Sequence, residues 1–220
     1  MKLVLATHNW DKAREIRKIL DGLDVEVSTL DEFEGAPHTV EDGTTLEENA
    51  LKKACEIRDF TGESALADDT ALEVDALDGA PGIYAARFAG EDATYDDNCN
   101  KILAELDGVA ESDRTARFRT VIALALSSRD AEASRERLSE PQLGRRTDTF
   151  VTEGVLVGTI TTAKRGESGF GYDSVFLDPI SGRTLAEMSA EEKNAISHRY
   201  RALVEMREML LRSGLAHEVS

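Results

Sequence analysis

Short apolar runs alternate with segments of helical periodicity from the start of the chain. The run at residues 2–7 leads into a polar turn, after which Ile16 and Leu20 recur at the i, i+4 spacing of an amphipathic helix. Gly22 is the expected end of that helix, because glycine accepts the left-handed backbone that closes helices. A buried strand that leads through a loop into a helix predicts an α/β architecture and argues against a bundle or a sandwich.

The same alternation continues along the chain. The later predicted strands are residues 25–28, 64–67, 71–77, 118–126, 150–157, 159–162 and 175–177, with a turn-rich loop at 78–82. The later predicted helices are one with a capping box at Thr44–Glu47 or Thr45–Glu48 that ends at Gly62, one over 95–106, and one from Ser189 to Gly214. These boundaries place Asp69 at the end of a strand and Gly158 at a bulge or turn.

Residues 127–149 interrupt this pattern, because they are polar and charged and show no period. We expect a solvated surface loop or hairpin extension there. The sequence contains no internal repeat and no linker that would separate two independent domains. It therefore predicts a single domain over residues 1–220 that carries this insertion.

The 43 acidic side chains outnumber the 26 basic ones, which gives a formal net charge of −17 at pH 7. Because affinity for nucleic acids comes mainly from lysine and arginine, this charge argues against a nucleic-acid partner. The apolar runs are too short for a membrane span or a signal peptide, so we expect no membrane partner. Two cysteines, Cys55 and Cys99, cannot form a disulfide framework. We therefore expect a cytoplasmic protein.

Only 8 of the 26 basic residues are lysines. An acidic chain with few lysines suggests adaptation to a salty cytoplasm, where screening weakens the repulsion among its carboxylates. We hypothesise a halophilic source. Equal melting temperatures in dilute buffer and in molar KCl would contradict this hypothesis.

The loop at residues 7–12 lies between the first predicted strand and the first predicted helix. A helix N-terminus has unpaired backbone N–H groups and a partial positive charge, so this loop can bind an anion, with Lys12 as an added charge. The glycines of a P-loop are missing, and an ordinary capped turn is the alternative. The candidate residues are Thr7, His8, Asn9, Trp10, Asp11 and Lys12.

Adjacent carboxylates occur at Glu41–Asp42 and at Asp68–Asp69. Burying such a pair without a cation or hydrogen bonds is costly. A magnesium ion removes that cost, because it takes oxygen ligands and holds phosphates through one or two protein carboxylates. In so acidic a chain, the alternative is a pair of solvated surface side chains.

Two further stretches combine aromatic and basic residues. The glycine-punctuated segment 166–173 holds Phe170 and Tyr172, which suggests an exposed platform for base stacking, with core aromatics in a tight turn as the alternative. Near the last predicted helix, Arg199 complements phosphate, and His198 offers a donor to a carbonyl oxygen on a base edge. A structural histidine is the alternative for His198.

These stretches occur together in one chain. The motifs are THNWDK at 7–12, EDGTTLEENALKKA at 41–54, LADDTALEVDALDGAPGIYAARFAGE at 66–91, GESGFGYDSVF at 166–176 and AEMSAEEKNAISHRYRAL at 186–203. Through them, over nearly its whole length, the chain resembles the non-canonical purine nucleoside triphosphate pyrophosphatases, the inosine/xanthosine triphosphatase or Ham1-like family.

The resemblance implies a long mixed sheet with flanking helices, two lobes around a nucleotide cleft, and a homodimer. It also implies Mg²⁺-dependent hydrolysis of ITP, dITP or XTP to the monophosphate and pyrophosphate, with Mn²⁺ as a substitute metal.

Roles for individual residues follow from the same resemblance. It implies that Asp69 is the general base and a metal-linked carboxylate, that Glu41 is a further metal ligand, and that Thr70 touches the substrate. The implied triphosphate contacts are Thr7, Asn9 and Lys12. The residues implied to hold the sugar and base and to read the 6-oxo group are Phe170, Gly171, Tyr172, Asp173, Lys193, His198 and Arg199.

Some positions depart from the family pattern. They are His8 in place of a glycine, Thr70–Ala71 in place of Ser-Gly, Ala85 in place of a serine and Ser174 in place of a proline. We expect these changes to affect specificity more than the reaction. Two other functions stay open, a pyrophosphatase for modified pyrimidine or methylated nucleotides and a nucleotide-sensing protein without catalysis. Asp69 and Lys12 argue against the second.

Overall fold

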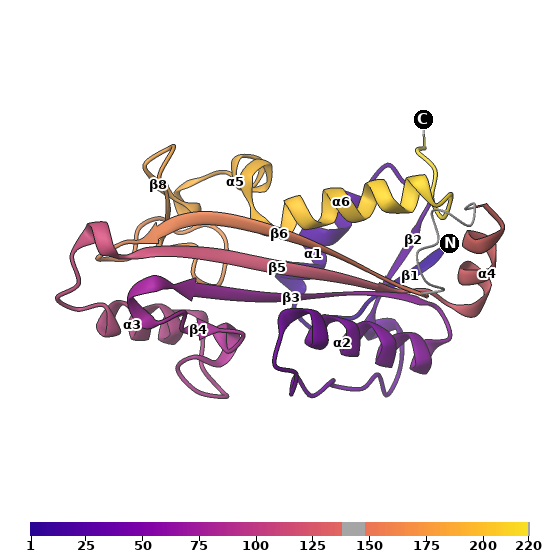
Figure 1. Ribbon diagram of the computed structural model, residues 1–220, viewed down its shortest axis with the longest axis horizontal. Coiled ribbons are helices and arrows are strands. Elements are labelled where there is room, and N and C mark those ends of the chain that lie inside the picture. The colour runs from indigo at the N-terminus through magenta and orange to yellow at the C-terminus, as the bar shows by residue number, and fades with distance from the viewer. Residues whose placement is uncertain (138–147, 220) are drawn as a thin grey trace. The chain divides into compact units, whose positions relative to one another are not determined.

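The computed structural model describes residues 1–137 and 148–219 of the chain. Its helices are α1 (Trp10–Leu20), α2 (Leu46–Thr61), α3 (Tyr95–Glu105), α4 (Ser128–Arg137), α5 (Ala190–Ile196) and α6 (His198–Arg212) (Figure 1). Its strands are β1 (Lys2–Leu5), β2 (Glu26–Thr29), β3 (Ser64–Val74), β4 (Pro81–Gly82), β5 (Thr115–Ala125), β6 (Thr149–Ile160), β7 (Phe176–Asp178) and β8 (Arg183–Thr184).

The strands form one sheet in the order β2-β1-β3-β5-β6-β7-β8, and β4 pairs with β3. Strand β1 runs parallel to both of its neighbours, with Leu3 opposite Val27 of β2 and Ser64 of β3. Strand β7 runs antiparallel to β6 and β8. The sheet is therefore mixed, which confirms the expected α/β class with a mixed central sheet.

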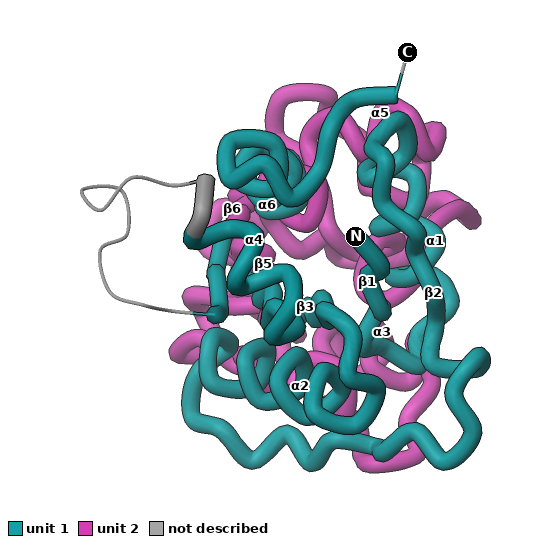
Figure 2. Tube along the Cα trace, turned by 90° about the vertical axis from the view of Figure 1, so that its right-hand side faces the viewer, with its two compact units in different colours: residues 1–69, 121–153, 202–220 teal, residues 70–120, 154–201 magenta. Residues whose placement is uncertain are grey.

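The chain divides into two compact units (Figure 2). Unit 1 comprises residues 1–69, 121–153 and 202–220, and unit 2 comprises residues 70–120 and 154–201. Strands β3, β5 and β6 contribute residues to both units. Each unit has its own apolar core.

The core of unit 1 holds helix α1 against β1. Ala13, Ile16 and Leu20 form the buried stripe of α1, at the predicted spacing. They belong to one apolar cluster with Leu3 and Leu5 of β1 and with side chains of α6. Each fully buried leucine or isoleucine contributes about 1.5–3 kcal/mol to the free energy of folding. The packing of this stripe therefore fixes α1 against β1, with the N-terminus of the helix close to the end of the strand.

Helix α2 begins and ends at residues that the sequence predicts, but only half of the predicted Thr45–Glu48 capping box is present, because the Glu48 carboxylate accepts from the backbone N–H of Thr44. The Thr45 side chain accepts a hydrogen bond from the backbone N–H of Glu48, and Gly62 closes the helix with a φ of 72°. Its buried face carries Asn49 and Lys53 besides apolar residues. These two polar side chains point to a function in addition to packing.

In unit 2 the core gathers side chains from β3, α3, β5 and β7. Leu72, Ile102, Phe118 and Phe176 are central members of this cluster. The rings of Phe118 and Phe176 lie 4.5 Å apart between centroids. Tyr172 is a member of this cluster, so the core anchors the loop at residues 166–173.

The prediction that Asp69 ends a strand is wrong. Residues 64–74 form one continuous strand, β3, and Asp69 lies in its middle. The prediction stopped at the carboxylate pair because aspartate is disfavoured in strands. The structure tolerates the pair because each carboxylate has a lysine partner on a helix.

Two other boundaries differ from the prediction. Strand β6 continues through Gly158, so this glycine is not a turn; a Cβ there would lie 2.4 Å from the carbonyl oxygen of Leu177. The helix that begins after Ser189 is interrupted at Ser197, whose extended ψ of 150° separates α5 from α6. The capping box of Ser189 and Glu192 is present as predicted.

The expectation of a solvated loop over residues 127–149 is wrong for its first part. Residues 128–137 form helix α4. Asp130, Ala131 and Ser134 are buried, and the Asp130 carboxylate accepts a 2.6 Å hydrogen bond from the Ser64 hydroxyl. These contacts bind the helix to β3 and explain why a polar segment without an evident period is ordered. Residues 138–147 of the predicted insertion lie outside the described residues.

No helix within residues 1–137 and 148–219 is long and apolar enough to cross a membrane. Cys55 and Cys99 are both free thiols. Burial raises the pKa of both thiols above the ordinary cysteine value. Cys99 belongs to the core of unit 2, whereas Cys55 is only half-buried.

Candidate active site

The loop after β1 is organised by Asn9. Its side-chain oxygen accepts hydrogen bonds from the backbone N–H groups of Asp11 and Lys12, at 3.0 and 3.1 Å. The backbone N–H of Asn9 in turn donates to the Thr7 hydroxyl at 3.1 Å. The amides of Asp11 and Lys12 are therefore capped by Asn9, and the charge that the loop offers to an anion is the Lys12 ammonium.

His8 and Trp10 differ from their neighbours in this loop. Both side chains are exposed, Trp10 by 67%. The His8 ring stacks on His38 with 3.8 Å between the centroids. This stack joins the loop to the segment that leads to Glu41.

Asp68 and Asp69 contact opposite helices. Successive side chains of a strand point to opposite faces of the sheet. Asp68 forms an ion pair with Lys12 of α1 at 3.1 Å. Asp69 accepts hydrogen bonds from Asn49 and Lys53 of α2, both at 3.2 Å. The two adjacent carboxylates are thus compensated by separate cations.

Lys53 connects Asp69 to Glu41. Its ammonium lies 2.7 Å from Glu41 Oε1 and 3.2 Å from Asp69 Oδ1. Burial by itself would lower the pKa of Lys53, but the nearby carboxylates of Asp69, Asp68 and Glu41 outweigh burial and hold this pKa above the ordinary lysine value. Lys53 therefore stays charged.

Burial raises the pKa of Asp69 above the ordinary aspartate value. The charges of Lys53 and Lys12 and the hydrogen bond from Asn49 counteract this rise, whereas the Glu41 carboxylate adds to it. A carboxylate with a raised pKa is a stronger base than a solvated one, which suits proton abstraction.

The donor set around Asp69 fits a divalent cation. Glu41 and Asp69 already share one cation, the Lys53 ammonium. Among the residues that the structure describes, no group of three or more His, Cys, Asp or Glu side chains could hold a metal ion. Two carboxylates are nevertheless enough for Mg²⁺, which completes its shell with waters and substrate phosphates.

In unit 2, Asp173 organises the glycine-rich loop. It accepts hydrogen bonds from the Lys193 ammonium at 2.6 Å and from the backbone N–H of Phe170 at 2.9 Å. A Cβ on Gly169 would lie 2.1 Å from Asp173 Oδ2, and its φ is 78°. Gly169 therefore permits both the turn and the close approach of the carboxylate.

Phe170 and Tyr172 lie in different environments. Phe170 is half-buried, with the Lys193 ammonium 4.5 Å and the Arg199 guanidinium 5.6 Å from its ring centroid. Tyr172 is buried, and its hydroxyl donates to the carbonyl oxygen of Ala85 at 2.8 Å. Tyr172 thus supports the loop from the core, so the predicted exposed platform is wrong for this ring. Gly171 joins the two with a φ of 62°.

His198 and Arg199 begin helix α6. The His198 ring is buried and stacks on Phe118 with 4.5 Å between the centroids. Arg199 donates to the Thr70 hydroxyl at 3.3 Å, and Thr70 also hydrogen-bonds Thr120 at 2.7 Å. Unit 2 therefore brings its predicted residues together around Phe170 and Thr70.

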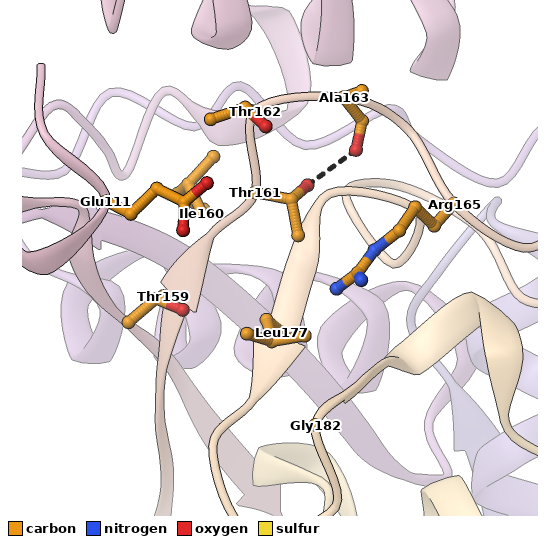
Figure 3. A pocket seen from close by; sticks show the side chains of 9 residues that line it. All are labelled: Glu111, Thr159, Ile160, Thr161, Thr162, Ala163, Arg165, Leu177 and Gly182. Atoms are coloured by element: carbon orange, nitrogen blue, oxygen red, sulfur yellow. Dashed lines mark hydrogen bonds between the residues drawn. The ribbon is translucent and has the colours of Figure 1, made fainter.

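Two cavities of unit 2 differ in whether predicted site residues line them. One of about 220 Å³ is lined by the loop at 166–171 together with Tyr95, Cys99, Asp173 and Ser174. Another, of about 240 Å³, lies at the end of β6, where the Thr161 hydroxyl donates to the carbonyl of Ala163 (Figure 3). None of the predicted site residues lines the second cavity, so the first is the one associated with the candidate site.

Residues 3–209 match the model of the Ham1 family. The chain belongs to the Ham1 family. Among its relatives is a dITP/XTP pyrophosphatase of Desulforamulus reducens, 46% identical with all of both chains covered. The dITP/XTP pyrophosphatase of Geobacter sulfurreducens is 44% identical over 97% of this chain and 98% of its own.

Solved Ham1 structures have the same fold. A HAM1 protein from Coxiella burnetii superposes with a TM-score of 0.80 at 37% identity, covering 96% of this chain and 98% of its own. The Ham1 protein of Staphylococcus aureus gives a TM-score of 0.78 at 34% identity, covering 96% and 98%. The mixed α/β sheet described above is therefore the Ham1 fold.

In this Ham1 chain, Asn49 and Lys53 hold the predicted Asp69 but carry no prediction from the sequence. A signal was present, because both share the buried face of α2 with Ala50, Ala54 and Ile57. A lysine and an asparagine within an apolar helical stripe need polar partners across the interface.

Proposed function

We propose that this chain hydrolyses non-canonical purine nucleoside triphosphates, such as ITP, dITP and XTP, to the nucleoside monophosphate and pyrophosphate. The observation that carries the proposal is the geometry around the buried Asp69, which accepts hydrogen bonds from Asn49 and Lys53 and shares the Lys53 ammonium with Glu41. Full-length relatives named dITP/XTP pyrophosphatases support the substrate class.

In the proposed reaction the unit 1 residues hold the phosphates. Asp69 accepts a proton from the attacking water, while Asn49 keeps the carboxylate in place. Lys12 stabilises negative charge on the departing pyrophosphate. A Mg²⁺ ion held by Asp69 and Glu41, with Mn²⁺ as a substitute, would neutralise phosphate charge. Thr7 and Asn9 would orient the triphosphate, with His8, Trp10 and Asp11 beside them in the loop.

The unit 2 residues are proposed to hold the sugar and base. Phe170 offers a half-buried ring, and the cations of Lys193 and Arg199 lie next to it. A donor from His198 or Lys193 would bind a 6-oxo group and would be left unpaired by the 6-amino group of adenine. Gly171, Tyr172 and Asp173 shape the loop around Phe170, and Thr70 meets the substrate beside Asp69.

The test is pyrophosphate release with magnesium in high KCl, comparing ITP, dITP, XTP, GTP, ATP and modified pyrimidine nucleotides at equal concentration. We expect release from ITP, dITP and XTP and little from GTP or ATP. Preferential release from the pyrimidine nucleotides would point to the alternative pyrophosphatase. Binding without any release would contradict the enzymatic function.

We also propose that the chain acts as a single-domain homodimer in the cytoplasm. The resemblance to the family supports the dimer, and the acidic composition with two free cysteines supports the location. Sedimentation equilibrium in high salt tests the dimer. A mass of 24.1 kDa would contradict it.

A further inference from the structure

Lys53 occupies the position between the two carboxylates that the proposed function assigns to the metal. Its side chain is 11% exposed, compared with 27% for Glu41 and 6% for Asp69. The ammonium contacts one oxygen of each carboxylate, at 2.7 and 3.2 Å. Asn49 contacts the other oxygen of Asp69, Oδ2. Lys53 and Asn49 therefore contact different oxygens of Asp69.

The two carboxylates require a cation between them. Both carboxylates contact the same ammonium, at 2.7 and 3.2 Å, so their like charges lie close enough to repel each other, and the Glu41 charge accordingly raises the pKa of Asp69. Without a positive charge, folding would have to bring these two carboxylates together at an energetic cost. In the metal-free protein, Lys53 removes that cost.

A lysine side chain can occupy a cation site and can also move out of it. Its ammonium is a compact charge at the end of a flexible four-carbon chain, so it can move by a few ångströms without moving helix α2. A divalent ion needs oxygen ligands and is repelled by a nearby ammonium. Lys53 and a metal ion therefore cannot both occupy the space between Glu41 and Asp69.

We infer that Lys53 is a positioning residue that stands in for the divalent cation, holding Glu41 and Asp69 in place until the metal displaces its ammonium from Glu41. The inference rests on the proposed function, because it takes Glu41 and Asp69 as the carboxylates at which the metal binds. The exchange lowers the affinity for free metal and keeps the site formed in its absence.

Mn²⁺ binding without nucleotide tests the exchange, with free Mn²⁺ measured by electron paramagnetic resonance. We expect Lys53→Met to bind Mn²⁺ about tenfold more tightly than the unaltered protein, because the competing cation is gone. Lys53→Arg, which keeps the charge, should bind like the unaltered protein. Lys52→Met is the matched control, since Lys52 lies on the same helix and pairs with the exposed Asp42.

Glu41→Gln separates failure of the inference from failure of the proposed site. If Glu41→Gln leaves Mn²⁺ affinity unchanged, the metal does not bind at Glu41 and the proposed site is wrong. If Glu41→Gln weakens binding while Lys53→Met leaves it unchanged or weakens it, the site stands and the inference about Lys53 is wrong.

Melting temperatures give a second measurement that a purely structural lysine would not reproduce. In EDTA, Lys53→Met should melt below the unaltered protein, and added Mn²⁺ should raise its melting temperature more than that of the unaltered protein. Equal increases in the two proteins would overturn the inference. If Lys53→Met does not fold in EDTA, Lys53→Gln, which retains a hydrogen-bond donor, replaces it in both measurements.

Discussion

The two predicted groups of site residues balance their charges in different ways. In unit 1, the Lys53 ammonium is shared by Glu41 and Asp69. In unit 2, Lys193 and Asp173 form a buried pair at 2.6 Å, and the same carboxylate also holds the backbone of Phe170. The first arrangement places two carboxylates on one cation, whereas the second pairs one buried carboxylate with one buried ammonium. This difference suits the first to phosphate chemistry with a metal and the second to recognition of a base.

The largest effect is expected for Asp69→Asn. This change removes the base but keeps the shape and one of the two acceptor oxygens, so kcat should fall at least about 100-fold while the nucleotide still binds. Steady-state kinetics and equilibrium nucleotide binding check both parts. A variant that retains more than about a tenth of kcat would exclude Asp69 as the general base.

The buried Lys193–Asp173 pair of unit 2 should contribute more to folding stability than an exposed ion pair does. Lys193→Met leaves the Asp173 carboxylate buried without its cation, and the free energy of unfolding should fall by about 3–5 kcal/mol. Lys52→Met, which breaks an exposed pair, should change it by less than about 1 kcal/mol. Urea unfolding measures both, and similar losses would contradict the contrast between buried and exposed pairs.

Base selectivity is expected to depend on unit 2. His198→Phe keeps a ring against Phe118 but removes the ring N–H donors, so the preference for ITP over ATP in kcat/KM should narrow by about tenfold or more. His198→Gln, which retains a donor, is the comparison. Unchanged selectivity in both variants would assign the reading of the 6-oxo group to another residue.

The smallest effect concerns the pH dependence of folding in EDTA. Because burial raises the folded-state pKa of Asp69, its contribution to stability is present below the unfolded pKa and is lost as pH rises through the folded one. The free energy of unfolding of Asp69→Asn, relative to that of the unaltered protein, should therefore increase with rising pH, by about 1.4 kcal/mol per pH unit between those two pKa values. A shift in the opposite direction would mean that the lysines outweigh burial.

Local sequence patterns were sufficient where neighbouring residues determine the structure. The capping residues Thr45 and Ser189 lie where the sequence predicts, because a cap involves only three or four consecutive residues. The continuous strand through Asp69 was not predicted, because its carboxylates are stabilised by lysines 56 and 16 residues away in the chain. Helix α4 was missed for the same reason, since Asp130 has its partner at Ser64.

The sequence by itself determined the α/β class and the motifs THNWDK, DDT, GFGYD and SHR that predicted the family, because helical periodicity and motif spacing are properties of neighbouring residues. Tertiary structure alone decided that Asp68 and Asp69 face different helices, that Tyr172 belongs to the core, and that Lys53 lies between Glu41 and Asp69. The charge balance and burial of these side chains depend on residues brought together by folding, and no local pattern specifies which lysine meets which carboxylate.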